Sequence, residues 1–445
     1  MHRESIYTPS IRICNIFSGP LMTPARLLRR LVLLEEGEAP ALLWSALYFF
    51  LLLFGFYLLR PVREAIGIAR GADKLPWLMT GTLVAMALAN PAFAALVSRL
   101  PRRRFIPWAY RFFALNMLAF FLAFRLLPGH GGAGLGYAFY IWLSVFNLFV
   151  VSVFWGLMSD VWSEVQGKRL FGFIATGGTL GAIAGAALTG ALTKGFGLGG
   201  LHVKVEPLSL LLLSMVTLEL AVQCVKRLAT IFALGDVAHG AREPGPGLLE
   251  GLRLIATSRY LQLICAYMLL FTITSTFLYL QQGAIVERTF HGNAARTAAF
   301  ARIDLWVNVL TLATQVFLTG RLITRLGIPF VLSILPVLSL AGFGALWAWP
   351  TFGVMALFQV LRRGLHYAVD RPAREILYIP LGPEERYKSK PFIDTFVYRG
   401  GDLLGVWAPT ALTALVIPVG LAAVGCSGLW LGSSLALGRR VKQFG

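Results

Sequence analysis

The amino-acid sequence predicts an all-α, polytopic membrane protein with about twelve transmembrane helices in two six-helix bundles. Hydrophobic residues make up 57% of the 445 positions and charged residues only 14%, whereas soluble domains carry about 25% charged residues. The mean hydropathy is +0.70. A chain with so few polar side chains cannot cover a water-exposed surface, so we expect most of its apolar surface to face lipid.

Apolar runs along the chain predict six spans, a polar linker and six more spans. An N-terminal cytoplasmic segment, 1–39, contains a short amphipathic helix expected to lie on the membrane surface. The first bundle covers 40–225, the cytoplasmic linker 226–257, the second bundle 258–437 and the cytoplasmic tail 438–445. The expected spans are 40–59, 75–97, 106–127, 135–158, 171–193, 208–225, 258–283, 300–320, 328–348, 350–368, 393–416 and 418–437.

The distribution of basic residues predicts the orientation. With both termini inside, about 29 of the 40 Lys and Arg residues lie in cytoplasmic loops and tails. We therefore expect both ends in the cytoplasm, in a bacterial cytoplasmic (inner) membrane. The net charge of +19 is explained by these loops and by their contact with anionic membrane lipids, so no nucleic-acid partner is expected.

Other function classes find little support in the sequence. The four cysteines have no metal-ligand spacing, and no Walker A motif is present. Gly195-x-Gly197-x-x-Gly200 matches the dinucleotide pattern but follows a membrane span, so we interpret it as a flexible loop. An enzyme would need convergent catalytic groups, and the six histidines are scattered. We expect a monomer that is not an enzyme and has no cofactor or metal.

Charged residues near span ends are the first candidate site, because charge inside a membrane usually marks a pathway. Arg60, Arg63 and Glu64 end the first span, with Pro61 between them. This loop is expected outside, so its basic residues oppose the positive-inside rule. The alternative interpretation is that these side chains simply extend to the lipid headgroups.

A second set of charges precedes the fifth and eleventh spans. Glu164 and Lys168 are four residues apart, which allows an ion pair on a helix, and Arg169 follows. The equivalent loop of the second half contains Lys388 and Lys390. Asp394 comes next, in the most charged region of the chain, which also contains the arginines and acids of 362–375 and 399–402. Solvated loops would explain part of this charge equally well.

Polar side chains inside spans are the third set. Asp304 and Asn308 lie one turn apart in the eighth span, and Gln282 ends the seventh. Glu219 lies in the sixth span, where it either faces a polar cavity or pairs with a neighbouring helix. A different repeat, Gly181-x-x-x-Gly185, predicts close packing of two helices.

Two short loops, 98–103 and 320–327, carry arginine at equivalent places in the two halves. The second resembles the major facilitator signature between spans two and three, and the first resembles a degraded copy of it. This resemblance implies two six-helix bundles related by an axis along the membrane normal, with a substrate site between them near the midplane.

Further motifs resemble the ATP/ADP translocases of intracellular bacteria and plastids. The matching residues are Arg63 and Glu64 after span one, Lys168, Arg169 and Phe171 before span five, and Lys388, Lys390, Asp394 and Gly400-Gly401 before and in span eleven. The resemblance implies nucleotide antiport without ATP hydrolysis. Two departures point to a divergent branch with another substrate: Arg63 replaces a common lysine, and Gln281-Gln282 replaces an acid at the end of span seven.

We therefore expect a secondary active transporter of nucleotides, by ATP/ADP-type exchange, or of a similar organic anion. The alternative is a major facilitator permease for another small solute, with Asp304 or Glu219 carrying a coupled proton. The expected substrate-binding residues are Arg60, Arg63, Glu64, Glu164, Lys168, Arg169, Gln282, Asp304, Asn308, Lys388, Lys390 and Asp394.

Overall fold

The computed structural model describes most of the chain after residue 34. The described residues are 35, 37–99, 102–127, 132–198, 201–203, 205–232, 248–382, 385, 389–390, 392–414 and 418–441. Among them, the backbone alone is described at 90–99, 102–103, 164, 168, 196–198, 201–203 and 248–252. The expected amphipathic helix in 1–39 lies largely outside the described residues.

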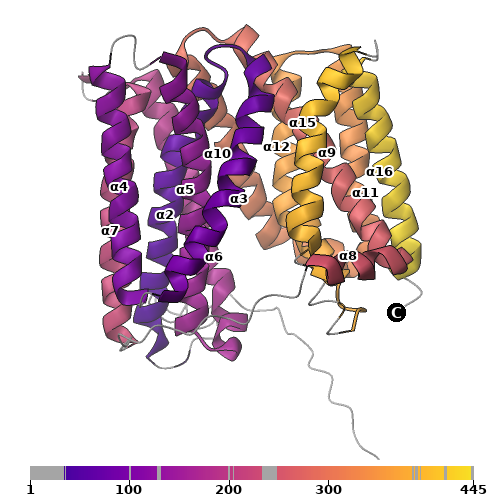
Figure 1. Ribbon diagram of the computed structural model, residues 1–445, viewed down its shortest axis with the longest axis horizontal. Coiled ribbons are helices and arrows are strands. Elements are labelled where there is room, and N and C mark those ends of the chain that lie inside the picture. Colours follow the sequence, from indigo (N-terminus) through magenta and orange to yellow (C-terminus); the bar gives the residue numbers. More distant parts are fainter. Residues whose placement is uncertain are drawn as a thin grey trace, which may run out of the picture.

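Six long helices form the first half, on the left of Figure 1. They are α2 (Glu38–Gly67), α3 (Leu75–Arg99), α4 (Arg102–Leu126), α5 (Gly132–Val161), α6 (Glu164–Lys194) and α7 (Leu210–Ile231). Short 3-10 turns precede two of them, η1 (Ala72–Lys74) and η3 (Pro207–Ser209). Between α6 and α7, strands β1 (Phe196–Leu198) and β2 (Leu201–Val203) pair antiparallel, so part of the segment interpreted as a loop is a small hairpin.

The second half contains more interrupted helices than the first. Its elements are α8 (Leu248–Thr257), α9 (Arg259–Thr289), α10 (Asn293–Phe317), α11 (Thr319–Ala348), α12 (Phe352–Leu365), η4 (His366–Asp370), α13 (Arg371–Ile376), η5 (Ile393–Val397), α15 (Tyr398–Ala414) and α16 (Val419–Val441). Both η4 and η5 are π-helical turns. Such turns are frequent at functional sites, and both lie in segments predicted as the tenth and eleventh spans.

Eight helices in the described part of the chain are long and apolar enough to cross a membrane: α2, α4, α5, α6, α7, α9, α11 and α16. Three of the other predicted spans coincide with less apolar or shorter helices, α10, α12 and α15, whereas the side chains of α3 are described only up to residue 89. For example, α12 and α15 contain 14 and 17 residues because π-helical turns interrupt those spans. Each predicted span overlaps a helix of the described structure, and three of these helices are too short or too polar to be recognised by apolar length alone.

Close packing of α2 on α6 depends on three glycines, Gly177, Gly181 and Gly185. A Cβ atom at Gly181 would lie 2.3 Å from the backbone oxygen of Phe50, and the other two positions are similarly tight against α2. Contacts this short leave no room for a side chain, so the backbones approach as the sequence repeat predicted.

The two halves pack together along α10, which contacts α6 and α2, and through an apolar cluster at one end of the molecule. One apolar cluster joins Ile68, Leu75 and Leu78 of the first half to Phe277 and Phe300 of the second. The two other clusters each belong to a single half. The joining cluster lies at the end opposite the start of α2, the helix α8 and the end of α16, which share the lower side of Figure 1. We call the joined side the closed end.

Candidate functional site

A cavity of about 940 Å³ lies between the two halves. Side chains of α2, α3, α5 and α6 line it from one half, and side chains of α9, α10, α12, α13 and α15 from the other. A second cavity of about 700 Å³ continues it into the second half. Residues common to both are Arg60, Met79, Asn147, Tyr279, Arg363, Tyr367, Arg371, Glu375, Arg399 and Asp402. We call the two together the central cavity.

Arginine outnumbers acid on the walls of the central cavity. The lining arginines are Arg60, Arg63, Arg362, Arg363, Arg371, Arg374 and Arg399. The lining acids are Glu64, Glu375, Asp394 and Asp402. Five of the seven arginines come from the second half, so the positive charge is concentrated on one side. The opposite wall is largely neutral and aromatic, with Phe49, Phe56 and Trp155.

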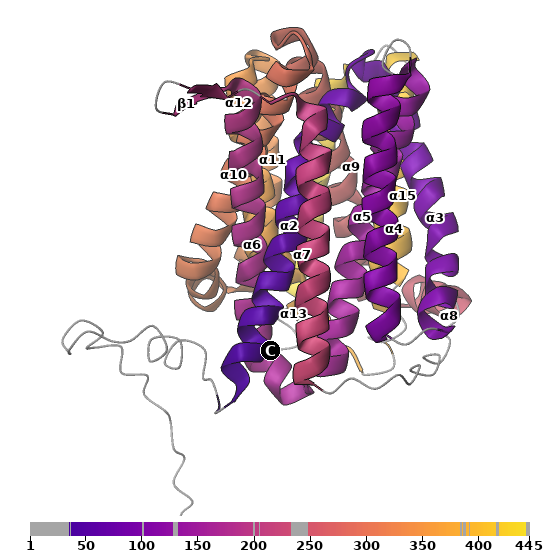
Figure 2. The same cartoon turned by 90° about the vertical axis from the view of Figure 1, so that its left-hand side faces the viewer.

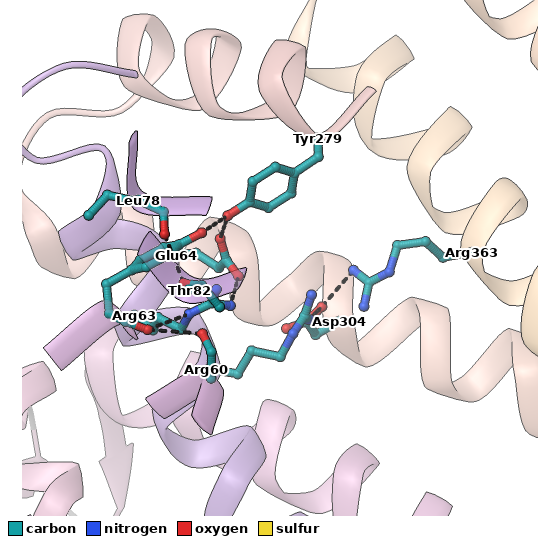
Figure 3. A network of polar contacts seen from close by, with 10 residues as sticks. Arg60, Arg63, Glu64, Leu78, Thr82, Tyr279, Asp304 and Arg363 are labelled. Atoms are coloured by element: carbon teal, nitrogen blue, oxygen red, sulfur yellow. Dashed lines mark hydrogen bonds and ion pairs between the residues drawn. The ribbon is translucent and has the colours of Figure 1, made fainter. Parts of the chain in front are cut away.

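Asp304 bridges the two halves through arginine. Its Oδ1 atom accepts hydrogen bonds from Arg60 of α2 and from Arg363 of α12, the latter at 2.9 Å. Figure 3 shows the carboxylate between the two guanidinium groups. Asp304 is 2% exposed, and within the described structure its Oδ2 atom has no hydrogen-bond partner. One carboxylate therefore balances two partly buried arginines, which leaves an excess positive charge at the cavity wall.

Arg63 and Glu64 form a second polar group that also joins the halves. Arg63 Nη1 lies 2.9 Å from Glu64 Oε1, and the guanidinium stacks on the Tyr140 ring at 3.9 Å. From the second half, the Tyr279 hydroxyl donates to Glu64 Oε2 at 2.6 Å and shares a 2.5 Å hydrogen bond with the Tyr140 hydroxyl. The group therefore ties the end of the first span to α9 (Figure 3).

Buried polar residues of the second half support the cationic wall. Arg362 donates to Ser339 at 3.1 Å and to Thr274 at 2.9 Å. Asp370 contacts His366 at 3.0 Å and Arg374 at 3.2 Å, and accepts from a tyrosine of α9 at 2.5 Å. These contacts surround the π-helical turn η4 and the following α13, which bring His366 and Arg374 respectively to the cavity wall.

Polar contacts also hold the closed end together. The backbone N–H of Ala72 donates to Glu287 Oε2 at 2.7 Å, and Arg296 donates to the backbone oxygen of Ile68 at 3.2 Å. Each bond joins one half to the other. The central cavity extends from the contact between Tyr140 and Tyr279 toward Arg371 and Glu375 of α13.

The structure places six of the predicted site residues at the central cavity. Five line it directly: Arg60, Arg63, Glu64, Asn308 and Asp394. The sixth, Asp304, forms an ion pair with the lining residue Arg60. Asn308 donates to the backbone oxygen of Asp304 at 2.8 Å. Lys390 pairs with Glu375, a lining acid.

Other predicted residues lie elsewhere or outside the described residues. Arg169 pairs with Glu38 at 2.9 Å, where α2 and α6 begin, and does not line the cavity. Gln282 is 3% exposed and packs in α9 behind the wall. Lys388 and the side chains of Glu164 and Lys168 are outside the described residues. Glu219 pairs with Arg111 on the outer face, which corresponds to the second of its two predicted roles.

Several cavity residues were not among the predicted substrate-binding residues. Arg363, Arg371 and Arg399 belong to the charged region noted in the sequence, and their density was the available signal. No sequence signal indicated Tyr140 and Tyr279, because tyrosine is common in membrane helices and the partners of these two residues lie far away in sequence. Arg371 is exposed in the cavity and has no ion-pair partner among the described residues.

Comparison with known proteins identifies the fold. No protein-family model matches the chain, and no curated protein matches it. A bacterial homologue of the human lysosomal transporter Spinster, in an inward-facing and unoccupied conformation, matches with a TM-score of 0.57 at 13% identity, over 92% of this chain and 96% of that one.

Two further solved structures match over similar lengths. A point mutant of the nucleoside transporter NupG gives a TM-score of 0.55 at 14% identity, over 91% of this chain and 99% of its own. An autoinhibited peptide transporter of the POT family gives a TM-score of 0.58 at 12% identity, over 91% of this chain and 97% of its own. At such identities the likeness shows the fold alone. The chain is an all-α polytopic membrane protein with a major-facilitator-like fold, as the sequence predicted.

Proposed function

We propose that this chain is a secondary transporter that moves an organic anion by alternating access, with ATP/ADP-type nucleotides as the first candidates. The observation that carries the proposal is the excess of arginine around one cavity between the two halves. Arg60 and Arg63 come from the first half and Arg363, Arg371 and Arg399 from the second. A multiply charged anion can accept hydrogen bonds from guanidinium groups of both halves at once.

The shape and chemistry of the cavity suit a substrate with two unlike ends. Its volume of about 940 Å³ is at the upper end of ordinary small-molecule sites, so a nucleotide fits. The arginines of the second half would hold the anionic end. Phe49, Phe56 and Trp155 of the first half offer aromatic surface to a flat apolar end. The resemblance to ATP/ADP translocases supports nucleotides within this class.

Asp304 explains how an anion could change the contacts between the halves. In this arrangement its carboxylate accepts from Arg60 and Arg363. An incoming phosphate or carboxylate group competes for the same donors and supplies the negative charge that Asp304 otherwise supplies alone. Because Arg60 and Arg363 belong to different halves, this exchange of partners is coupled to the relative position of the bundles.

A proton-coupled permease remains the second candidate, favoured by one specific feature. The Asp304 carboxylate is buried and its Oδ2 atom has no partner in the described structure, so it offers a proton acceptor between the halves. Glu219, the other expected proton carrier, is held by Arg111 on the outer face and does not line the central cavity.

Uptake into proteoliposomes tests the proposal. The purified protein is reconstituted with unlabelled nucleotide inside, and entry of labelled ATP or ADP is followed, with phosphorylated and carboxylated metabolites as competitors. We expect saturable uptake that survives an uncoupler and is lost in Arg363→Gln. Arg302→Gln is the matched control, because Arg302 is exposed on α10 and does not line the cavity.

Two results would reject parts of the proposal. Absence of transport for every nucleotide and every other organic anion in the panel would remove the anion carrier. Uptake of a neutral solute that collapses with an uncoupler would favour the proton-coupled permease instead.

A further inference from the structure

An ion pair lies exposed on the outer face of α4 and α7, away from the central cavity. Arg111 Nη2 lies 2.9 Å from Glu219 Oε1, and Arg111 Nε donates to Glu219 Oε2 at 3.1 Å. Gln223 donates to the same carboxylate at 2.7 Å. The two side chains of the ion pair are 54% and 45% exposed. Figure 2 faces this side of the molecule and shows α7 and α4 on its surface.

The pair lies well inside the apolar layer. Arg111 follows Arg104 by seven residues in α4, and Glu219 precedes Lys226 by seven residues in α7. At a helical rise of about 1.5 Å per residue, each charge lies about 10 Å from the nearest basic residue at its span end. Both helices therefore place the pair at the same depth, within a hydrocarbon layer about 30 Å thick.

Charge at this depth on a lipid-facing surface is unfavourable, and charged residues within spans normally face a protein interior or a water-filled cavity. Arg111 could extend toward the headgroups on its long side chain, but it is held instead in a two-pronged contact with Glu219. The surrounding side chains are apolar and exposed: Trp108, Phe112 and Leu115 on α4 and Val216 and Leu220 on α7. Lipid tails make favourable contacts with those apolar side chains, but they have no polar group that could interact with the ion pair.

A second copy of this chain, related by a two-fold axis, would place an opposite charge beside each charge of the pair. A two-fold axis along the membrane normal keeps every residue at its own depth and brings identical surfaces together. An arginine beside a glutamate at one depth is self-complementary under that axis, because each arginine meets the glutamate of the other copy. A neutral partner helix would leave the charges exposed to an apolar surface.

We propose that the outer face of α4 and α7 is the surface through which two copies of this chain associate in the membrane, with the Arg111–Glu219 pairs at its centre. Four charges then form one buried network, surrounded by the apolar side chains of the same face. The sequence alone predicted a monomer, and the exposed ion pair is the reason to expect two copies. The proposal does not depend on what the central cavity binds.

Charge reversal tests the proposal directly. The full chain is reconstituted in bilayers and its self-association is measured by single-molecule photobleaching at graded protein-to-lipid ratios. We expect Arg111→Glu and Glu219→Arg to weaken association on the order of tenfold or more, because like charges then face each other within and between copies. The double variant Arg111→Glu with Glu219→Arg restores both sets of pairs, so we expect association to return.

Cysteine cross-linking locates the contact. With the native cysteines replaced by serine, we expect Leu220→Cys to form a disulfide-linked pair in bilayers. The matched control is Leu435→Cys on α16, which is similarly exposed on the opposite edge of the molecule. A monomeric wild type at every protein-to-lipid ratio would overturn the proposal. So would association that is unchanged by all three charge variants, or equal cross-linking at Leu435→Cys.

Discussion

Replacing Asp304 with asparagine removes the negative charge that Arg60 and Arg363 share and leaves a side chain of the same shape. Because the Asp304 carboxylate competes with the substrate for these donors, we expect Asp304→Asn to bind an anionic substrate more tightly. The expected change is therefore an increase in affinity, whereas removal of a side chain that contacts the substrate lowers the affinity.

The magnitude follows from the geometry of the bridge. Asp304 Oδ1 lies 2.9 Å from Arg363 Nη1. A substrate anion on the cavity side of the same guanidinium adds a second contact of about 3 Å, so the two negative charges lie about 6 Å apart. Their repulsion is about 3 kcal/mol at an effective dielectric constant of about 20, and half of that at about 40 in a hydrated cavity. Removing it tightens binding about tenfold to a hundredfold.

Equilibrium binding of ADP to the purified protein, measured by calorimetry, is the assay. Asp73→Asn is the control, because Asp73 is an exposed acid that pairs with Lys74 at the closed end. Transport by Asp304→Asn is expected to fall even as affinity rises, since the bridge no longer re-forms after release. Unchanged or weaker binding in Asp304→Asn, with normal folding, would refute the competition between carboxylate and substrate.

Three further predictions follow from the same structure. Arg363→Ala should weaken anion binding about 10- to 100-fold, because a charge-assisted hydrogen bond contributes about 1.5–3 kcal/mol, and a Kd within twofold of wild type would contradict it. Gly181→Ala should lower the free energy of unfolding by about 1–3 kcal/mol, because the new Cβ atom would lie 2.3 Å from the Phe50 backbone. The control is Gly172→Ala, whose Cβ atom would meet nothing within 4 Å. Equal melting temperatures for the two variants would contradict this packing explanation. Glu287→Ala removes the acceptor of the Ala72 N–H and should open the closed end more often. Faster labelling of Thr311→Cys by an impermeant thiol reagent added at that end would show this, and unchanged labelling would oppose it.

Much of the fold could be predicted because apolar runs and glycine spacing act locally. A membrane span needs about 20 apolar residues, and that requirement is visible in any single segment of the chain. The Gly181-x-x-x-Gly185 repeat likewise predicted a close helix contact without reference to its partner. The interruption of spans ten and eleven by π-helical turns, which begin at His366 and Ile393, was not visible in the apolar pattern.

The candidate site was predicted only in part. Arg60 and Glu64 stand out in an apolar run, so their sequence context was sufficient to select them. Their partners, Asp304 and Tyr279, lie 244 and 215 residues away, and only the packing of the two halves brings them together. Arg169 shows the converse case, because an equally conspicuous charge serves to join α2 and α6 through Glu38.

The central claim is that the cavity binds an anion through arginines of both halves. The most direct measurement compares the thermal stabilisation of the purified protein by ADP with that by adenosine, which lacks the phosphates. A ligand that binds the folded state alone raises the melting temperature, and more so the tighter it binds. The account predicts stabilisation by ADP, or by another organic anion of the panel, and none by its uncharged counterpart. Equal stabilisation by charged and uncharged members of each pair, or by neutral solutes alone, would contradict it.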